Sequence, residues 1–323
     1  MKNYYILKKY CERIFMIGSG NFWYNENEIG DDRSMFYRTY NTLLFLIYGF
    51  MTVFEIMAAT MGDFPEDEKR DSVTFAVSHT IVMIKIFSVI ANKSLIKTLN
   101  HKMVTVCESY EENALMEISS IAGIELISYF SYKTNTNFCR SHFVTVVTYY
   151  PTFEDDSVLA TLVRVFTTVV LFIMMITMIV SVDSFTMVYL IMYKYKFITL
   201  KQYFENLRRD FFALNDNGQQ DMATEKLANG LIEGIEMHNS LLRLSGDIDK
   251  AFGTVMALQV CQSSGSAVSL LLQIALSDQL TFMMSMKIIF FVVALFFLLG
   301  LFLCNAGEIT YQVINLSYST VVF

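Results

Sequence analysis

Residues 288–304 read IIFFVVALFFLLGLFLC, a run that contains no charged side chain. A helix needs about 20 apolar residues to cross the hydrocarbon core of a bilayer, so this run predicts a membrane-spanning helix. The whole chain agrees, since 54% of its 323 residues are hydrophobic and 17% are charged. Soluble proteins carry roughly 25% charged residues. The sequence therefore predicts a membrane protein.

Four further apolar blocks are long enough to span a bilayer as helices, at residues 42–61, 73–91, 158–193 and 252–276. Both prolines, Pro65 and Pro151, lie between blocks, so no proline removes a backbone hydrogen-bond donor inside a span. The blocks are also about twice as long as a strand of a membrane barrel needs to be. We predict an all-α membrane protein with five clear spans.

The charges near the span ends predict the orientation of the chain. Residues 62–71 hold five acids and two bases, and residues 150–156 hold three acids and no base. Basic residues gather instead in the N-terminal arm and after the second and third blocks, which places the N-terminus in the cytosol. We expect residues 1–41 to form a cytosolic arm. Residues 194–250 are expected to form a cytosolic extension of amphipathic helices, with a turn at residues 215–220.

The predicted orientation requires one further membrane crossing between the second block and residue 150. A cytosolic N-terminus followed by two spans returns the chain to the cytosol at Asn92, whereas the acidic segment 150–156 is expected outside. The best candidate for the crossing, residues 114–130, contains Glu117 and Glu125. Each acid costs about 2.5–3.5 kcal/mol at a helix centre on insertion scales. Either this weak third span crosses with help from its neighbours, or a genuine span has been lost.

Several stretches resemble insect odorant receptors. They are VSVDSFTMVYLIMYKYKFITLKQYFENL at residues 180–207, GEIT at 307–310, and the closing QVINLSYSTVVF at 312–323. Residues 141–156, SHFVTVVTYYPTFEDD, resemble the extracellular loop of moth receptors of the pheromone-receptor branch. The resemblance implies a single odorant-receptor-like helical bundle over residues 1–323, with seven spans and a cytosolic N-terminus.

The resemblance also implies a function. Members of the family bind a volatile odorant or pheromone in an apolar pocket in the outer half of the bundle. They assemble with a common co-receptor into a hetero-tetrameric cation channel, here expected in the plasma membrane of olfactory sensory neurons. By the same analogy Ile314, Leu316 and Tyr318 line the pore.

The chain departs from the family pattern at two places. One is the weak third span, and the other is the junction of Tyr311 with Gln312, where the family has a cytosolic helix and a turn. We interpret the chain as a variant with two internal losses and a truncated seventh span. This leaves an alternative function open, that of a non-conducting variant that pairs with receptor subunits and dampens them.

Two ladders of side chains four residues apart are candidates for ligand contacts: Phe75, His79 and Met83 in the second block, and Phe166, Val170 and Met174 in the third. Aromatic and methionine side chains suit an adaptable apolar pocket. They suit helix packing or lipid contact as well, and packing is the favoured role for His79.

Polar residues inside the blocks have structural interpretations. Glu55, Lys85 and Arg164 lie close enough to span ends to extend their charged groups to the membrane interface. The small residues 263–267 favour a close contact between two helices rather than a binding site.

Other protein classes fit the sequence less well. A G-protein-coupled receptor would show prolines in several spans together with D/E-R-Y-like and NPxxY-like motifs, and none of these features is present in the sequence. The four histidines are scattered and no HExxH or GxGxxG motif occurs, so we expect neither an enzyme nor a cofactor. The net charge of −7 argues against nucleic-acid binding, and five cysteines without a CxxC pair argue against a disulfide framework.

Overall fold

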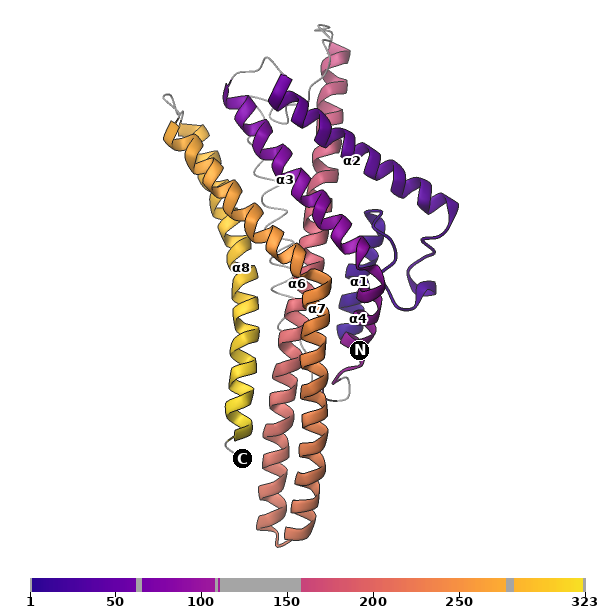
Figure 1. The fold of residues 1–323 in the computed structure, drawn as a ribbon, viewed down its shortest axis with the longest axis vertical. Coiled ribbons are helices and arrows are strands. Elements are labelled where there is room, and N and C mark those ends of the chain that lie inside the picture. Colours follow the sequence, from indigo (N-terminus) through magenta and orange to yellow (C-terminus); the bar gives the residue numbers. More distant parts are fainter. Residues whose placement is uncertain (1, 62–65, 108–109, 111–157, 277–281, 322–323) are drawn as a thin grey trace.

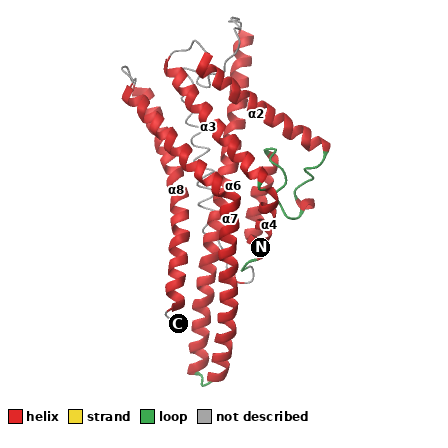
Figure 2. Cartoon of the chain, viewed as in Figure 1, coloured by secondary structure: helices red, strands yellow, loops and turns green. Residues whose placement is uncertain are grey.

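The computed structural model describes residues 2–61, 66–107, 110, 158–276 and 282–321. These ranges contain helices, turns and loops but no strand (Figure 2), which confirms the predicted all-α fold. In chain order the elements are α1 (Lys2–Met16), a short 3-10 helix (Glu26–Glu28), α2 (Met35–Met61), α3 (Glu66–Ala91), α4 (Lys93–Thr105), α6 (Val158–Asp216), α7 (Gln220–Leu276) and α8 (Phe282–Val321). Figure 1 shows α6, α7 and α8 running side by side along the long axis of the molecule.

Each of the five apolar blocks forms a helix, as predicted, on α2, α3, α6, α7 and α8. By length and hydropathy, two stretches within the described residues can cross a membrane, Gln220–Leu272 and Leu295–Ile314. A third candidate is the pair Ala76–Ala91 and Lys93–Thr105, which is bent by 70° at Asn92. The weak third span, residues 114–130, lies outside the described residues.

The helices α6 and α7 form a hairpin that extends beyond the rest of the bundle (Figure 1). They contain 59 and 57 residues, and at a rise of about 1.5 Å per residue both are far longer than the roughly 30 Å of a bilayer core. The turn between them falls within residues 215–220, as predicted. Gly218 adopts a φ of +76°, and the amide of Gln219 donates to the carbonyl of Leu214 at 3.1 Å, a Schellman ending that only glycine adopts readily.

Two glycines bring the arms of this hairpin close together. A Cβ atom added to Gly234 would lie 2.5 Å from two ring carbons of Phe204, and one added to Gly230 would lie 2.5 Å from the side chain of Leu207. The spacing of four residues places both glycines on one face of α7. Because these two glycines have no side chains, α6 and α7 can pack closely at these positions.

The N-terminal arm packs on the bundle through α1, which contacts α4 and α6. Asn100 of α4 is fully buried, and its side chain joins these parts. Its amide donates to the carbonyl of Phe22 at 2.8 Å, and its oxygen accepts a hydrogen bond from the Tyr189 hydroxyl of α6. The arm is thus part of the folded core.

The helix α8 continues without a turn from Phe282 to Val321. It unites the charge-free run with the closing residues 312–321, which therefore do not form a helix of their own. Glu308, which follows the apolar run, pairs with Lys194 of α6 at 3.1 Å. The part of α8 that carries Glu308 consequently lies alongside α6.

Candidate functional site: the polar seam of the bundle

A buried lysine joins three helices at the centre of the bundle. The ammonium of Lys85 on α3 donates to Asp183 of α6 at 3.0 Å, to Gln262 of α7 at 2.8 Å and to Gln259 of α7. Gln259 also donates to Ser263 at 3.3 Å. An ammonium has three N–H donors, so every donor of Lys85 has an acceptor.

Burial makes this ion pair important for folding. The side chain of Lys85 is 1% exposed and that of Asp183 is 8% exposed. Removing one partner of a buried pair leaves an uncompensated charge and costs about 3–5 kcal/mol. The two charges cancel, and the glutamine oxygens satisfy the remaining donors, so the cluster is tolerated inside an apolar bundle.

The expectation that Lys85 extends to the membrane interface is therefore wrong. Its ammonium is directed into the bundle because Asp183 supplies an opposite charge there at bonding distance. The positions of the Glu55 and Arg164 side chains, for which the same role was expected, lie outside what the structure describes.

Two further contacts extend this cluster along the boundary of α3 and α7. The hydroxyl of Ser78 lies 3.5 Å from that of Ser266, and the amide of Asn92 donates to the carbonyl of Ala251 at 3.3 Å. Ser78 and Lys85 of α3 and Asn92, which directly follows α3, are spaced seven residues apart, two turns of helix, so they lie along one face. We refer to these three residues and their partners on α6 and α7 as the polar seam.

The serine-rich stretch 263–267 takes part in this seam through two of its members. Ser263 and Ser266 are buried, whereas a Cβ atom at Gly265 would meet nothing within 4 Å. The predicted close contact between helices is present at Ser266. It is made by hydroxyl groups and does not involve the glycine.

The candidate ligand residues of α3 lie next to the seam. His79 is 1% exposed, and its ring packs edge-on against Tyr48 of α2 with 6.2 Å between the centroids. Met83 is half-buried against the core. Phe75 lies on the same helix, but its side chain lies outside what the structure describes. These observations agree with helix packing at His79, and ligand contact stays a prediction.

The candidate ligand residues on α6 also differ in how far their side chains are buried. Met174 packs against the core to which Met83 also belongs, whereas Val170 is 45% exposed. Phe166 lies on α6 without a described side chain. The structure thus brings Met83 and Met174 to one core and leaves Val170 at the surface.

The predicted pore-lining residues all lie near the end of α8. Ile314 is 50% exposed, and the side chains of Leu316 and Tyr318 are outside the described set. Ten residues of helix separate Ile314 from Cys304, the end of the apolar run, which is a rise of about 15 Å.

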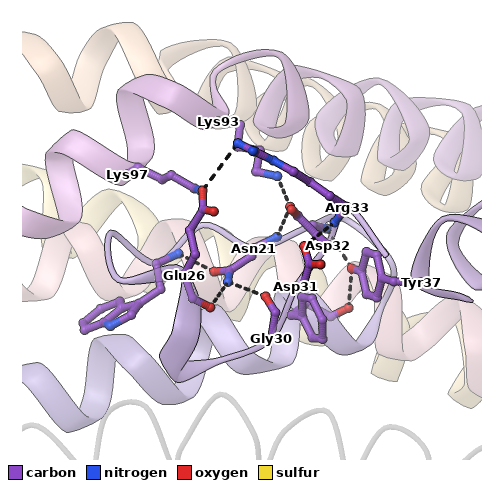
Figure 3. Close-up of polar contacts among 12 residues, drawn as sticks. Asn21, Glu26, Gly30, Asp31, Asp32, Arg33, Tyr37, Lys93 and Lys97 are labelled. Atoms are coloured by element: carbon purple, nitrogen blue, oxygen red, sulfur yellow. Dashed lines mark hydrogen bonds and ion pairs between the residues drawn. The ribbon is translucent and has the colours of Figure 1, made fainter. Parts of the chain in front are cut away.

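A second polar network, which the sequence did not indicate, surrounds the loop between α1 and α2 (Figure 3). Asn21 closes the loop: its backbone amide donates to Asp32 at 2.8 Å, and its side-chain amide donates to the carbonyl of Gly30 at 2.8 Å. Lys93 of α4 pairs with Asp32, and Lys97 pairs with Glu26 at 2.5 Å. We refer to this loop and its two lysine partners as the N-terminal clasp.

The carboxylates of the clasp are held in their charged forms. The hydrogen bond from Lys97 lowers the pKa of Glu26. Burial opposes the charge of Asp32, but bonds from Lys93 and the Asn21 amide outweigh burial and lower its pKa. Glu28 accepts hydrogen bonds from Tyr4, Lys8, Asn25 and the Trp23 indole, and its pKa falls from 4.5 to about 2.

Within the described residues, two helical stretches and one bent pair that are long and apolar enough to cross a membrane are typical of a multi-pass helical membrane protein. A family model described as 7tm Odorant receptor matches residues 67–320, well over half of the chain, so the chain belongs to the 7tm odorant receptor family. The predicted resemblance to insect odorant receptors is confirmed.

A solved structure shares the fold. The structure of the insect olfactory receptor OR5 from Machilis hrabei is similar to this chain with a TM-score of 0.70 at 17% sequence identity. The similarity covers 97% of this chain and 83% of that one. No curated protein matches the sequence. The moth pheromone-receptor branch and the two internal losses stay predictions.

Proposed function

We propose that the chain is an odorant-receptor subunit that binds a small volatile apolar ligand and gates a cation channel together with a co-receptor. Membership of the odorant receptor family supports the olfactory role. The polar seam is the observation that supports a gating role most directly. It ties α3, which carries Phe75, His79 and Met83, to the two helices that extend beyond the bundle.

Ligand binding is proposed at the boundary of α3 and α6. Met83 and Met174 supply flexible, polarizable side chains from the two helices, and His79 supplies a polar group among apolar neighbours. Phe75, Phe166 and Val170 complete the proposed set. A pocket of this kind recognises a ligand mainly through apolar area, with a few polar groups fixing its orientation.

The test is a two-electrode current recording from oocytes that express this chain with an insect co-receptor. Moth pheromone components and plant volatiles are applied in turn, with the co-receptor alone as the control. A ligand-evoked inward current above that control is the expected result. Silence with confirmed surface expression would contradict gating by this chain.

A second candidate function is favoured by α8. Because residues 312–321 continue α8 rather than forming a separate helix, the chain fits a non-conducting subunit that pairs with receptor subunits and dampens them. Co-injection with a full-length relative distinguishes the two functions, because a dampener reduces the response of that relative.

The pore-lining role of Ile314, Leu316 and Tyr318 can be tested directly. Cys139 and the exposed Cys261 and Cys304 are first replaced by serine, and Ile314→Cys is then treated with a membrane-impermeant thiol reagent during odorant application. A pore-lining position predicts loss of the evoked current. An unchanged current would instead place Ile314 outside the conduction pathway.

The proposed topology places the N-terminus and the clasp in the cytosol. Asn92 lies in the sequon Asn92-Lys93-Ser94, and its amide donates to the carbonyls of Ser88 and Ala251. We expect Asn92 to carry no glycan in the expressed protein, as read by a glycosidase mobility shift. A glycan there would reverse the topology.

A further inference from the structure

The N-terminal clasp borders a surface cavity of about 400 Å³ that is open to solvent and lined by Glu26, Asp32, Arg33, Ala91, Lys93, Ser94 and Lys97. Three cations and two carboxylates face this cavity, which leaves one net positive charge. Arg33 is mostly exposed and reaches Glu26 only at 4.0 Å. The cavity therefore presents cationic groups that its own acids do not fully neutralise.

The lysines of the cavity keep donors for a ligand. Lys93 donates to Asp32 and Lys97 donates to Glu26. Each ammonium has three N–H groups, so two on each lysine are left for a further acceptor. The first turn of α4 also faces the cavity with Ser94, and the side chain of Asn92 does not cap this helix.

The cavity lies at the boundary of the apolar part of the bundle. Ala91, the last residue of the apolar block of α3, lines the cavity, and Arg33 precedes the first residue of α2, Met35, by two residues. Met35 and Phe36, at the start of α2, are each 86% exposed. Exposed apolar side chains beside cations are typical of a surface that meets lipid headgroups.

An apolar track leads from the cavity along α3. Ile84, Phe87 and Ala91 are exposed and follow helical spacing, so they form one stripe. The ring of Phe87 stacks on that of Phe45 of α2, with 5.8 Å between centroids. The stripe continues the path from the charged cavity into the membrane-facing surface.

This geometry points to a binding site for one anionic glycerophospholipid, with its phosphate among Arg33, Lys93 and Lys97 and an acyl chain along Ile84 and Phe87. The charge of the cavity complements a phosphate, and the adjoining stripe complements an acyl chain. A free phosphate would use the charge but not the stripe. The site requires only the membrane location of the chain and does not depend on odorant binding.

The test uses the purified full chain in detergent, with water-soluble dioctanoyl phosphatidylglycerol as the probe. Trp23 is the only tryptophan in the chain and lies in the clasp, so its fluorescence reports the thermal unfolding of this region. We expect a saturable rise in Tm with the lipid. Inorganic phosphate at the same concentration is expected to leave Tm unchanged, and dioctanoyl phosphatidylcholine is expected to bind more weakly.

Two variants and one control localise the effect. Arg33→Gln and Lys97→Gln should each weaken the apparent lipid affinity about tenfold, as expected for the loss of one charge-assisted hydrogen bond. Arg38→Gln, an exposed arginine of α2 that does not line the cavity, should behave as the parent chain. Arg33 is mostly exposed, so its replacement is not expected to impair folding.

Three results would overturn the site. They are no lipid-dependent shift, equal shifts in Arg33→Gln and Arg38→Gln, or an equal response to inorganic phosphate. Because the readout is lipid binding by purified protein, a failure of odorant-evoked currents would not affect it. The proposed function and the lipid site are thus tested independently.

Discussion

Replacing Lys85 by methionine tests the buried ion pair that joins α3 to α6 and α7. Methionine keeps the length and apolar volume of the lysine stem but leaves the Asp183 carboxylate and two glutamine oxygens without the ammonium. Breaking a buried pair in this way costs about 3–5 kcal/mol. For a chain of this size, at about 2 °C per kcal/mol, Tm should fall by roughly 6–10 °C.

The double variant Lys85→Met with Asp183→Leu separates charge from packing. It removes both charges, so the desolvation penalty of the lone carboxylate disappears, and stability should return to within about 1–2 kcal/mol of the parent chain. The assay is thermal unfolding of the detergent-solubilised protein, followed by size-exclusion chromatography.

A matched surface pair supplies the control. Lys226 and Asp210 pair at 2.8 Å, but each side chain is about half exposed, at 54% and 49%. Lys226→Met should therefore cost less than about 1 kcal/mol. If Lys85→Met proves as mild as this control, or if the double variant is no more stable than the single one, the assignment of a buried, mutually compensating pair is incorrect.

The hairpin and the clasp give two further predictions. Gly234→Ala should destabilise the chain by about 1–2 kcal/mol in thermal unfolding, because the clash with the Phe204 ring outweighs the gain in helix propensity. At the control position Gly246, an added Cβ atom meets nothing within 4 Å, so Gly246→Ala should stabilise the chain by up to about 1 kcal/mol. Equal shifts in the two variants would refute this packing. Glu28 has a depressed pKa of about 2, so its contribution to the clasp is complete above pH 4.5 and is lost as pH falls toward 2. Trp23 fluorescence should change over that window and show no such step in Glu28→Gln.

The helices and the hairpin turn could be predicted because their signals are local. Apolar runs of bilayer length, the absence of proline within them and a glycine in the segment 215–220 all act within a few residues of one another. The same local reasoning could also have found Gly230 and Gly234, whose spacing of four places them on one helix face. It could not have shown that Phe204 and Leu207 are the residues that face them.

The partner of Lys85 could be predicted only in part. A lysine in an apolar block requires a counter-charge or an exit to the interface, and Asp183 in the third block was available as the counter-charge. The choice between these outcomes depends on the register of α3 against α6 and α7, which the sequence of a single helix does not contain. The positions of Gln259 and Gln262 depend on the same register.

The N-terminal clasp could not be predicted because its segment has no helical or alternating periodicity. Its ion pairs join Asp32 to Lys93 and Glu26 to Lys97, across a separation of about 60 to 70 residues. Charged residues in a polar loop are usually solvated, so nothing in the sequence distinguishes these acids from their neighbours. Only the packing of α1 on α6 and of α4 on α7 brings them together.

The contacts of the polar seam differ in strength along α3, and this difference affects how a ligand could move α3 in the proposed gating. Its contact nearest the start of α3 is a 3.5 Å pair of serine hydroxyls, and its central contact is the charged Lys85 cluster. At the other end Asn92 lies at the 70° bend between α3 and α4 and donates to the carbonyl of Ala251. A ligand beside His79 would therefore act on the weakly held part of α3, between Ser78 and the Lys85 anchor. Displacement there would disturb one weak hydrogen bond, whereas displacement at Lys85 would expose a buried charge, so α3 is expected to pivot about Lys85 rather than to slide past it.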